Sequence, residues 1–581
     1  MAEYKINDIY QGGYSSFKSD YGDFVGYRVP NKAIGITTDP RVADVMTEVS
    51  QKIAPGGKTV ELSLVSPEVF ESIPDQHLKE VNRLAKLTGV DITVHAPIVE
   101  PSGMSKEGFS EVNREATERQ MNLAIKRAHE VSPDGSIPVT FHSSAVLPGK
   151  EVVKTKKGEE VKGMIVVNSE TGSMHRIKAE EEKYFPGEKK DIQGELDRIN
   201  EDQWRSALTH LSYNTERANE AINLSNVTAQ LAEAEKKAGR ELTPEERQLS
   251  FRYNAGVNFL NDSYRELKEL YNMAYKNVGD EEKKILNDFK NKIQKDVEKI
   301  NKNPSGRENI ELTKKIVEDG VETLNRIPVP RIFKPLDEFS KEKTTTTFAN
   351  VAFDSYKQFK DKAPIISIEN PPVGAAFSRG EELKDIVEES RKKFVERAKK
   401  EGMSVSEAEK AAAKMLGVTW DVGHINMLRR YGYEKEDIVK ETEQVKKLVK
   451  HVHLSDNFGF EHTELPMGMG NVPFKEIMEQ LGKEGYEAKK IIEASSWWQH
   501  FKSSPVAESM KALGSPIYSM QMAPYWNQAV GLQQGYFGGY GEMLPGIHYE
   551  TFGAGFSQLP NELGGSRGGG AGSRMGGRGM E

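Results

Sequence analysis

The sequence predicts an α/β protein built on a (β/α)8 TIM barrel, with a large, mostly helical insertion after strand four and a Gly-rich C-terminal tail. Three observations predict this fold. Short apolar runs alternate with longer amphipathic stretches, eight such strand–helix steps occur, and one highly charged stretch separates the first four from the last four. Eight buried parallel strands covered by helices are what a barrel of this class requires.

The first half of the barrel is predicted over residues 31–146, after an N-terminal extension over residues 1–30. Its apolar, β-rich runs are Ala33–Thr37, Thr59–Val65, Asp91–His95 and Ile137–His142. Amphipathic helical patterns follow the first three of them, at Val42–Ile53, Asp75–Leu87 and Arg114–His129. A strand followed by a helix, repeated in this way, indicates parallel strands.

The alternation stops over residues 147–344, where the chain is highly charged. Gly163–Val167 and Met174–Ile177 flank a polar turn and predict a small hairpin. Long helical patterns follow, and one of them opens with Thr243, Pro244, Glu245 and Glu246. A Thr cap, a Pro in the first turn and a Glu three residues after the cap form a capping box. We therefore expect a mostly helical insertion here.

The second half of the barrel is predicted over residues 345–515. Its strand candidates are Ile365–Glu369, Val418–Asp421, Val452–Leu454 and Lys490–Glu493, with amphipathic helices between and after them. Residues 516–581 form a tail rich in Gly and aromatic residues, and we expect disorder at its end, from about Gly564. Arg-Gly tracts in this tail could contact nucleic acid weakly, although a flexible tail explains them equally well.

Composition limits the chemistry that the chain can perform. The 581 residues carry a formal net charge of −8, so there is no whole-protein basic surface for nucleic acid. The absence of cysteine excludes disulfides and thiolate metal sites, which leaves histidine and carboxylate side chains as metal ligands. Neither a signal peptide nor a run of 18 apolar residues is present, so we expect a cytoplasmic protein without a membrane segment.

Polar side chains fall at the ends of the predicted strands. Six successive strands finish in a His, Asp or Glu, and two nearby loops add three more such residues. The nine are His95, His142, Glu369, Asp421, His424, His453, His462, Glu464 and Glu493. The carboxyl ends of the strands of a parallel barrel converge on one rim, where the active sites of this fold lie.

A single histidine at a strand end is more often a hydrogen-bonded structural residue than a ligand. Four carboxylates and five imidazoles buried together, however, require a compensating cation, and this predicts a metal site.

These residues resemble the strand-end motifs of the xylose isomerase-like TIM barrels, a superfamily that includes endonuclease IV and sugar isomerases and epimerases. The motifs are His95-Ala96-Pro97, Ile368-Glu369-Asn370, Asp421-Val422-Gly423-His424, His453-Leu454-Ser455-Asp456 and Gly468-Met469-Gly470. The resemblance spans about residues 30–150 and 345–515. Each motif alone is weak, but their order and their positions at the strand ends are fairly specific for the superfamily.

The resemblance to endonuclease IV implies three metal positions. His95, His142 and Glu369 would hold the first ion. Glu369 would bridge to a second ion, which Asp421, His453 and Glu493 complete. The third set would be His424, His462 and Glu464. The family usually supplies Asp-x-His in the last loop, whereas this chain has His462-Thr463-Glu464, so the geometry of the third position is in question.

The same resemblance implies a metal-dependent phosphodiester hydrolase that acts on DNA with an abasic site by using metal-activated water. Zinc, up to three ions, or manganese would be the cofactor, and Glu369, Asp421 and Glu493 would be the catalytic carboxylates. No Gly-rich loop stands between a strand and a helix, so no nucleotide cofactor is expected.

Two alternatives remain at this point. A sugar isomerase or epimerase of the superfamily needs one metal, which Glu369, Asp421, His453 and Glu493 would hold, with His424 binding a small sugar substrate. The Leu465-Pro466 pair and the net negative charge favour this alternative, while His95 and His142 favour the hydrolase. A barrel without catalytic activity, serving as a binding or assembly module, is the third interpretation.

Overall fold

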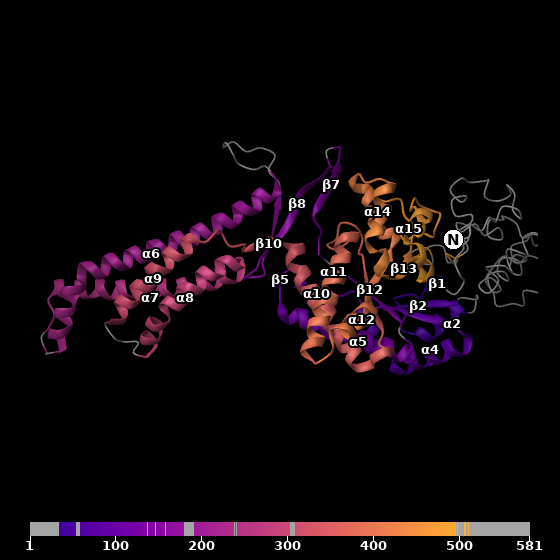
Figure 1. Ribbon diagram of the computed structural model, residues 1–581, viewed down its shortest axis with the longest axis horizontal. Coiled ribbons are helices and arrows are strands. Elements are labelled where there is room, and N and C mark those ends of the chain that lie inside the picture. Colours follow the sequence, from indigo (N-terminus) through magenta and orange to yellow (C-terminus); the bar gives the residue numbers. More distant parts are fainter. Residues whose placement is uncertain are drawn as a thin grey trace, which may run out of the picture. The chain divides into compact units, whose positions relative to one another are not determined.

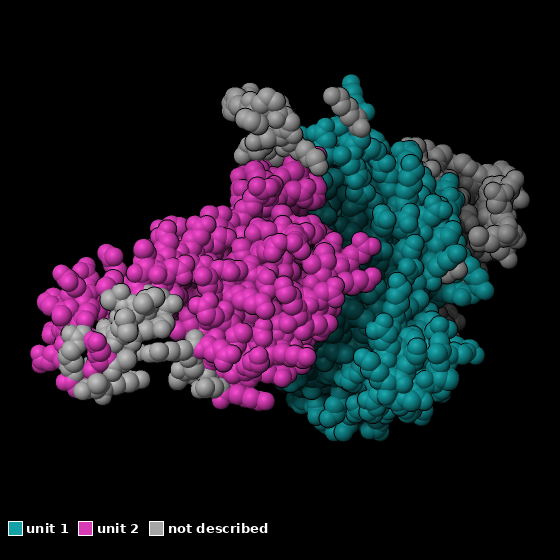
Figure 2. Space-filling view, turned by 60° about the vertical axis from the view of Figure 1, so that its left-hand side comes forward, with its two compact units in different colours: residues 1–162, 337–581 teal, residues 163–336 magenta. Residues whose placement is uncertain are grey.

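The structure is a computed structural model that describes residues 34–53, 58–135, 137–145, 147–156, 158–178, 191–237, 239, 241–302, 308–494, 497, 505, 506 and 509. The predicted N-terminal extension over residues 1–30 and the predicted tail over residues 516–581 lie outside the described residues. Contacts divide the chain into two compact units, residues 1–162 with 337–581 and residues 163–336, which Figure 2 colours separately.

The first unit contains the predicted closed barrel (Figure 1). Its eight strands are hydrogen-bonded in the order β1-β14-β13-β12-β11-β6-β3-β2, and every neighbouring pair is parallel. In chain order they are β1 (Ile34–Thr37), β2 (Thr59–Ser63), β3 (Asp91–His95), β6 (Pro138–His142), β11 (Ile365–Glu369), β12 (Leu416–Asp421), β13 (Val449–Leu454) and β14 (Lys489–Ile492). The fold class predicted from the sequence is therefore confirmed.

Helices cover the outside of the barrel, as Figure 1 shows. The longer ones are α2 (Val45–Ile53), α4 (Asp75–Thr88), α5 (Glu111–Val131), α10 (Leu336–Phe359), α11 (Gly380–Lys400), α12 (Val405–Met415), α14 (Lys435–Val445) and α15 (Phe474–Glu487). Short helices also follow two of the strands, α3 (Pro67–Ser72) after β2 and α13 (Val422–Asn426) directly after β12. Strands buried on both faces explain the uninterrupted apolar runs in the sequence. All six residues of β12 are buried, and its Trp420 donates Nε1–H to Thr442 Oγ1 on α14 at 3.1 Å.

The second unit is mostly helical. Its helices are α6 (Ile192–Lys237), α7 (Pro244–Asn277), α8 (Asp280–Lys302) and α9 (Glu308–Arg326). The capping box predicted at the start of α7 forms, because Thr243 Oγ1 accepts the Glu246 N–H at 3.2 Å and Glu246 Oε2 accepts the Thr243 N–H at 2.8 Å. Among the described residues of the whole chain, no helix is long and apolar enough to cross a membrane.

The hairpin predicted within this unit also forms. Strand β9 (Met174–Lys178) pairs antiparallel with β8 (Gly158–Asn168), and β10 (Phe333–Pro335) lies on the other side of β8. Four of the described strands were not predicted from the sequence. They are β10, β7 (Glu151–Thr155), next to β8, and the antiparallel pair β4 (Met104–Ser105) and β5 (Gly108–Phe109).

Candidate metal centre

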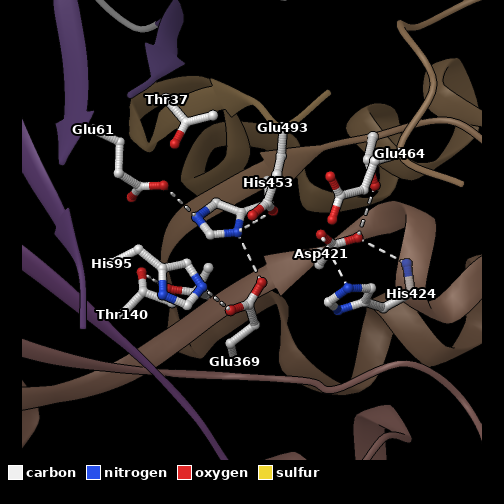
Figure 3. A network of polar contacts seen from close by, with 12 residues as sticks. Thr37, Glu61, His95, Thr140, Glu369, Asp421, His424, His453, Glu464 and Glu493 are labelled. Carbon is white, nitrogen blue, oxygen red and sulfur yellow. Dashed lines mark hydrogen bonds and ion pairs between the residues drawn. The ribbon is translucent and has the colours of Figure 1, made fainter. Parts of the chain in front are cut away.

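The register of the barrel strands places the predicted site residues side by side. Glu369, the last residue of β11, is the register partner of His142, the last residue of β6. In the same way Asp421 of β12 is the partner of His453 of β13. Parallel strands in a closed barrel all end at one rim. Residues that are hundreds of positions apart in the sequence therefore meet there, as Figure 3 shows.

Glu369 lies at the centre of the cluster and is fully buried. Its Oε2 atom is 3.2 Å from the Nε2 atom of His95 and also 3.2 Å from the Nε2 atom of His142. Its Oε1 atom is 2.8 Å from the Nδ1 atom of His453. The two oxygens of one carboxylate thus face two different sets of imidazole nitrogens. This arrangement suits a carboxylate that bridges two cations.

A second group forms around the oxygen of Glu369 that faces His453. Glu369, Asp421, His453 and Glu493 each offer one nitrogen or oxygen, and these four atoms all lie within 4.8 Å of one another. Glu493 follows β14 directly, and its Oε2 atom is 2.9 Å from His453 Nδ1. Three carboxylates and one imidazole provide a full set of ligands for a divalent ion.

The three loop residues form a third group. His424 follows β12 at the third residue of α13, and its Nε2 atom is 2.7 Å from the Nε2 atom of His462. The Glu464 Oε1 atom is 3.7 Å from His462 Nε2. His424 Nδ1 lies 2.7 Å from the backbone oxygen of Asn370, so it carries the proton and leaves Nε2 available as an acceptor or ligand. Glu464 adopts a left-handed backbone, with φ of 44°, and such strain is frequent at functional sites.

The ionisation of the cluster is strongly perturbed. Burial raises the pKa of Asp421, and the nearby charges of Glu493 and Glu369 raise it further, to well above its ordinary range. Burial also acts to raise the pKa of Glu369, but the charges of His453 and His142 outweigh it and hold that pKa well below its ordinary range. Carboxylates packed this closely repel one another when ionised, and a bound divalent cation would neutralise their charge.

Two buried oxygens of the cluster remain available to bind an ion. Glu369 Oε2 and Asp421 Oδ2 are buried and have no hydrogen-bond partner among the described residues. Glu369 Oε2 nevertheless lies 3.2 Å from two imidazole nitrogens, at distances that suit common ligands of one ion. Buried polar groups are nearly always satisfied, so the unpaired atoms indicate a missing partner. The residues present therefore fit a metal, and their nitrogen and oxygen atoms suit zinc or manganese.

All nine residues predicted from the sequence lie at this rim, in the three groups described above. Two further residues of the cluster, Glu61 and His451, were not predicted from the sequence. They are fully buried within β2 and β13. The Glu61 Oε2 atom accepts hydrogen bonds from Thr93 Oγ1 at 3.1 Å and from His451 Nε2 at 2.9 Å. A signal was present in the sequence, because Glu61 is the one charged residue in the run Thr59–Val65, where an unpaired charge would be costly.

Comparison with known proteins agrees with the barrel. Residues 399–514 match the family described as xylose isomerase-like TIM barrel. A stretch of 94 residues, 16% of this chain, is 31% identical to the uncharacterized protein MJ1311 of Methanocaldococcus jannaschii, and it spans 31% of that relative's length. The solved structure of a D-tagatose 3-epimerase-like protein aligns with 84% of this chain and 99% of its own at 15% identity. The TM-score of this alignment is 0.34.

Proposed function

We propose, from the site geometry and the match of residues 399–514 to the xylose isomerase-like TIM barrels, that this chain is a divalent-metal-dependent phosphodiester hydrolase resembling endonuclease IV. DNA containing an abasic site is the proposed substrate, and zinc or manganese is the proposed cofactor. His95, His142 and Glu369 would hold one ion, and Glu369, Asp421, His453 and Glu493 a second. His424, His462 and Glu464 would hold a third.

One observation carries this proposal. His95 and His142 both place Nε2 at 3.2 Å from one oxygen of Glu369, while the other oxygen of Glu369 faces His453 Nδ1 at 2.8 Å. A single ion held by Glu369, Asp421, His453 and Glu493 would not need these two imidazoles as ligands. A pair of ions that share Glu369 uses all of them.

Divalent ions bound here would lower the pKa of water, bind a phosphate and stabilise the leaving oxygen. The protein's own residues supply the rest. Glu369 and His453 are fully buried and therefore rigid, so they hold their ligand atoms in place before substrate arrives. Glu493 and His462 keep side-chain exposures of 18% and 34%, so the substrate approaches the cluster from their side.

A sugar isomerase or epimerase is the second candidate, and a specific observation favours it. The four ligand atoms of Glu369, Asp421, His453 and Glu493 lie within 4.8 Å of one another, which is already a complete site for one ion. In that case carboxylates of the set would remove a proton from the carbon next to the carbonyl of a small sugar. They would return it to the same carbon in an epimerase, or to the former carbonyl carbon in an isomerase, and His424 would bind the substrate.

The test combines elemental analysis of the purified full chain with two assays, cleavage of abasic-site DNA and conversion of small ketoses. The hydrolase predicts two or three ions per chain, DNA cleavage, and loss of that cleavage in His142→Ala with at least one ion retained. One ion, ketose conversion and an active His142→Ala would establish the isomerase instead. His129→Ala is the matched control, because His129 lies near the end of α5 and outside the cluster. Its ring stacks on that of Phe359, and the two ring centroids are 3.9 Å apart. A chain that binds no metal even after reconstitution would overturn both candidates and leave a non-catalytic barrel.

A further inference from the structure

His453 makes polar contacts through both of its ring nitrogens. Its Nδ1 atom is 2.8 Å from Glu369 Oε1 and 2.9 Å from Glu493 Oε2. Its Nε2 atom is 3.3 Å from Glu61 Oε1. Figure 3 shows Glu61 and Glu369 at different nitrogens of the His453 ring. The imidazole therefore connects the proposed metal ligands with a carboxylate that lies deeper in the barrel.

Glu61 is itself held in one orientation. It is fully buried on β2, and its Oε2 atom accepts two hydrogen bonds, from Thr93 Oγ1 on β3 at 3.1 Å and from His451 Nε2 on β13 at 2.9 Å. Both donors act on the same oxygen. The other oxygen, Oε1, has no hydrogen-bond partner among the described residues and is the one that lies beside His453 Nε2.

This contact selects a tautomer of His453. A carboxylate accepts hydrogen bonds and does not donate them, so the contact with Glu61 is favourable only when Nε2 carries a proton. A neutral imidazole then has its lone pair on Nδ1, the nitrogen that faces Glu369 and Glu493. Metal-bound histidines generally donate their second ring N–H to a carboxylate or carbonyl in this way.

A direct metal role for Glu61 is less consistent with the contacts. Ligand atoms of Glu61, His451 and His453 do lie within 4.8 Å of one another, close enough for an ion. Such an ion would need His453 Nε2 as a ligand, and His453 would then bridge two ions and lose both ring protons. In addition, Oε2 of Glu61 and Nε2 of His451 are already hydrogen-bonded to each other.

We propose that Glu61 is a positioning residue that accepts the Nε2–H of His453 and thereby presents Nδ1 of His453 to the metal. Thr93 and His451 fix the Glu61 carboxylate for this task. The proposal rests on the metal-binding function proposed above. In this role Glu61 acts through its contact with His453 and does not touch the substrate.

The test is metal affinity in Glu61→Gln. Gln has the size of Glu but no charge, and its amide can donate to Nε2 and so favour the wrong tautomer of His453. We expect the affinity for Zn²⁺, measured by competition with a chromogenic chelator, to fall 10- to 100-fold, in the range usual for outer-shell partners. The visible absorption spectrum of the Co²⁺-substituted protein should also change, because the orientation of a ligand has changed. Glu441→Gln is the matched control. Glu441 is a buried carboxylate of α14 that lies away from the cluster and accepts a hydrogen bond from Arg379, the residue before α11.

The outcomes separate this proposal from the proposed function. Wild-type affinity and an unchanged Co²⁺ spectrum in Glu61→Gln, with the wild type binding metal, would overturn the role of Glu61 alone. A wild type that binds no Zn²⁺ would overturn both. If Glu61→Gln does not fold, Thr93→Val replaces it, because losing one of the two donors to Oε2 should lower Zn²⁺ affinity several-fold. Unchanged Zn²⁺ affinity in Thr93→Val would then overturn the proposal.

Discussion

The Nε2 atoms of His424 and His462 lie 2.7 Å apart, although one residue comes from α13 and the other from the loop after β13. At this distance the two nitrogens share one proton or bind one ion, since two N–H groups cannot face each other. Burial lowers the pKa of His424 to about 3, and the charge of His462 contributes to the same effect. His424 is therefore neutral near pH 7 and available as a ligand.

Replacing His462 tests the third metal position. We expect His462→Ala to contain one metal ion fewer than the wild type while remaining folded, because His462 lies in a loop and its side chain is 34% exposed. Elemental analysis and thermal unfolding measure both properties. Glu461→Gln, an exposed neighbour in the same loop, is the control. Equal metal content in His462→Ala and the wild type would show that no ion depends on this residue.

The metal-free protein should lose stability as the pH rises above neutrality. Burial alone would lower the pKa of His95, but the hydrogen bond and charge of Glu369 outweigh it and raise that pKa to about 9 from an ordinary 6.5. Protonated His95 therefore stabilises the fold, fully below pH 6.5 and progressively less as the pH passes through about 9. One proton changes the unfolding free energy by at most about 1.4 kcal/mol per pH unit.

Urea unfolding of chelator-treated protein between pH 6.5 and 9 measures this effect, and His95→Gln should reduce the slope. The same slope in His95→Gln and in the parent protein would assign the pH dependence to other groups.

Gly423 permits the close approach of α13 to the end of β13. A Cβ atom at this position would overlap Ser455 Oγ and would lie 2.9 Å from the backbone oxygen of Ser455. We expect Gly423→Ala to destabilise the protein by about 1–3 kcal/mol, as overpacking does, and to weaken metal binding because His424 is the next residue. Denaturant unfolding and metal titration test this. Gly402→Ala is a contrasting variant, because its Cβ would meet nothing within 4 Å and only its φ of 89° is unfavourable. Full metal affinity in Gly423→Ala would contradict the prediction.

Asp456 holds the loop that carries His462 and Glu464. Its carboxylate accepts four backbone N–H groups at 2.8–3.1 Å, those of Asn457, Gly468, Gly470 and Val472. Asp456→Ala would leave these donors without their partner, at about 1–3 kcal/mol for each that stays buried and unpaired. We expect a loss of at least about 3 kcal/mol in unfolding free energy and faster amide hydrogen exchange at Gly468 and Gly470. Unchanged exchange at those two amides would show that other contacts hold the loop.

Much of the fold could be predicted because its signals are local. Alternation of apolar runs and amphipathic stretches reveals buried strands and covering helices whatever their neighbours are. The predicted strand Ile365–Glu369 therefore matches β11 residue for residue, and the capping box at Thr243 marks the start of α7. Boundaries were less accurate where polar residues lie inside a strand. For example, β13 begins at Val449, three residues before the predicted start at Val452, because Lys450 and His451 interrupt its apolar run.

The residue types that end the strands follow from the amino-acid sequence, and a parallel barrel then requires their side chains to meet at one rim. Which atoms face each other depends on the folded barrel. That His95 and His142 share one oxygen of Glu369, and that Glu61 lies beside Nε2 of His453, depends on the register of strands far apart in the chain. Such pairings leave no local pattern, because they arise only when β2, β3, β6, β11 and β13 come together in a closed barrel.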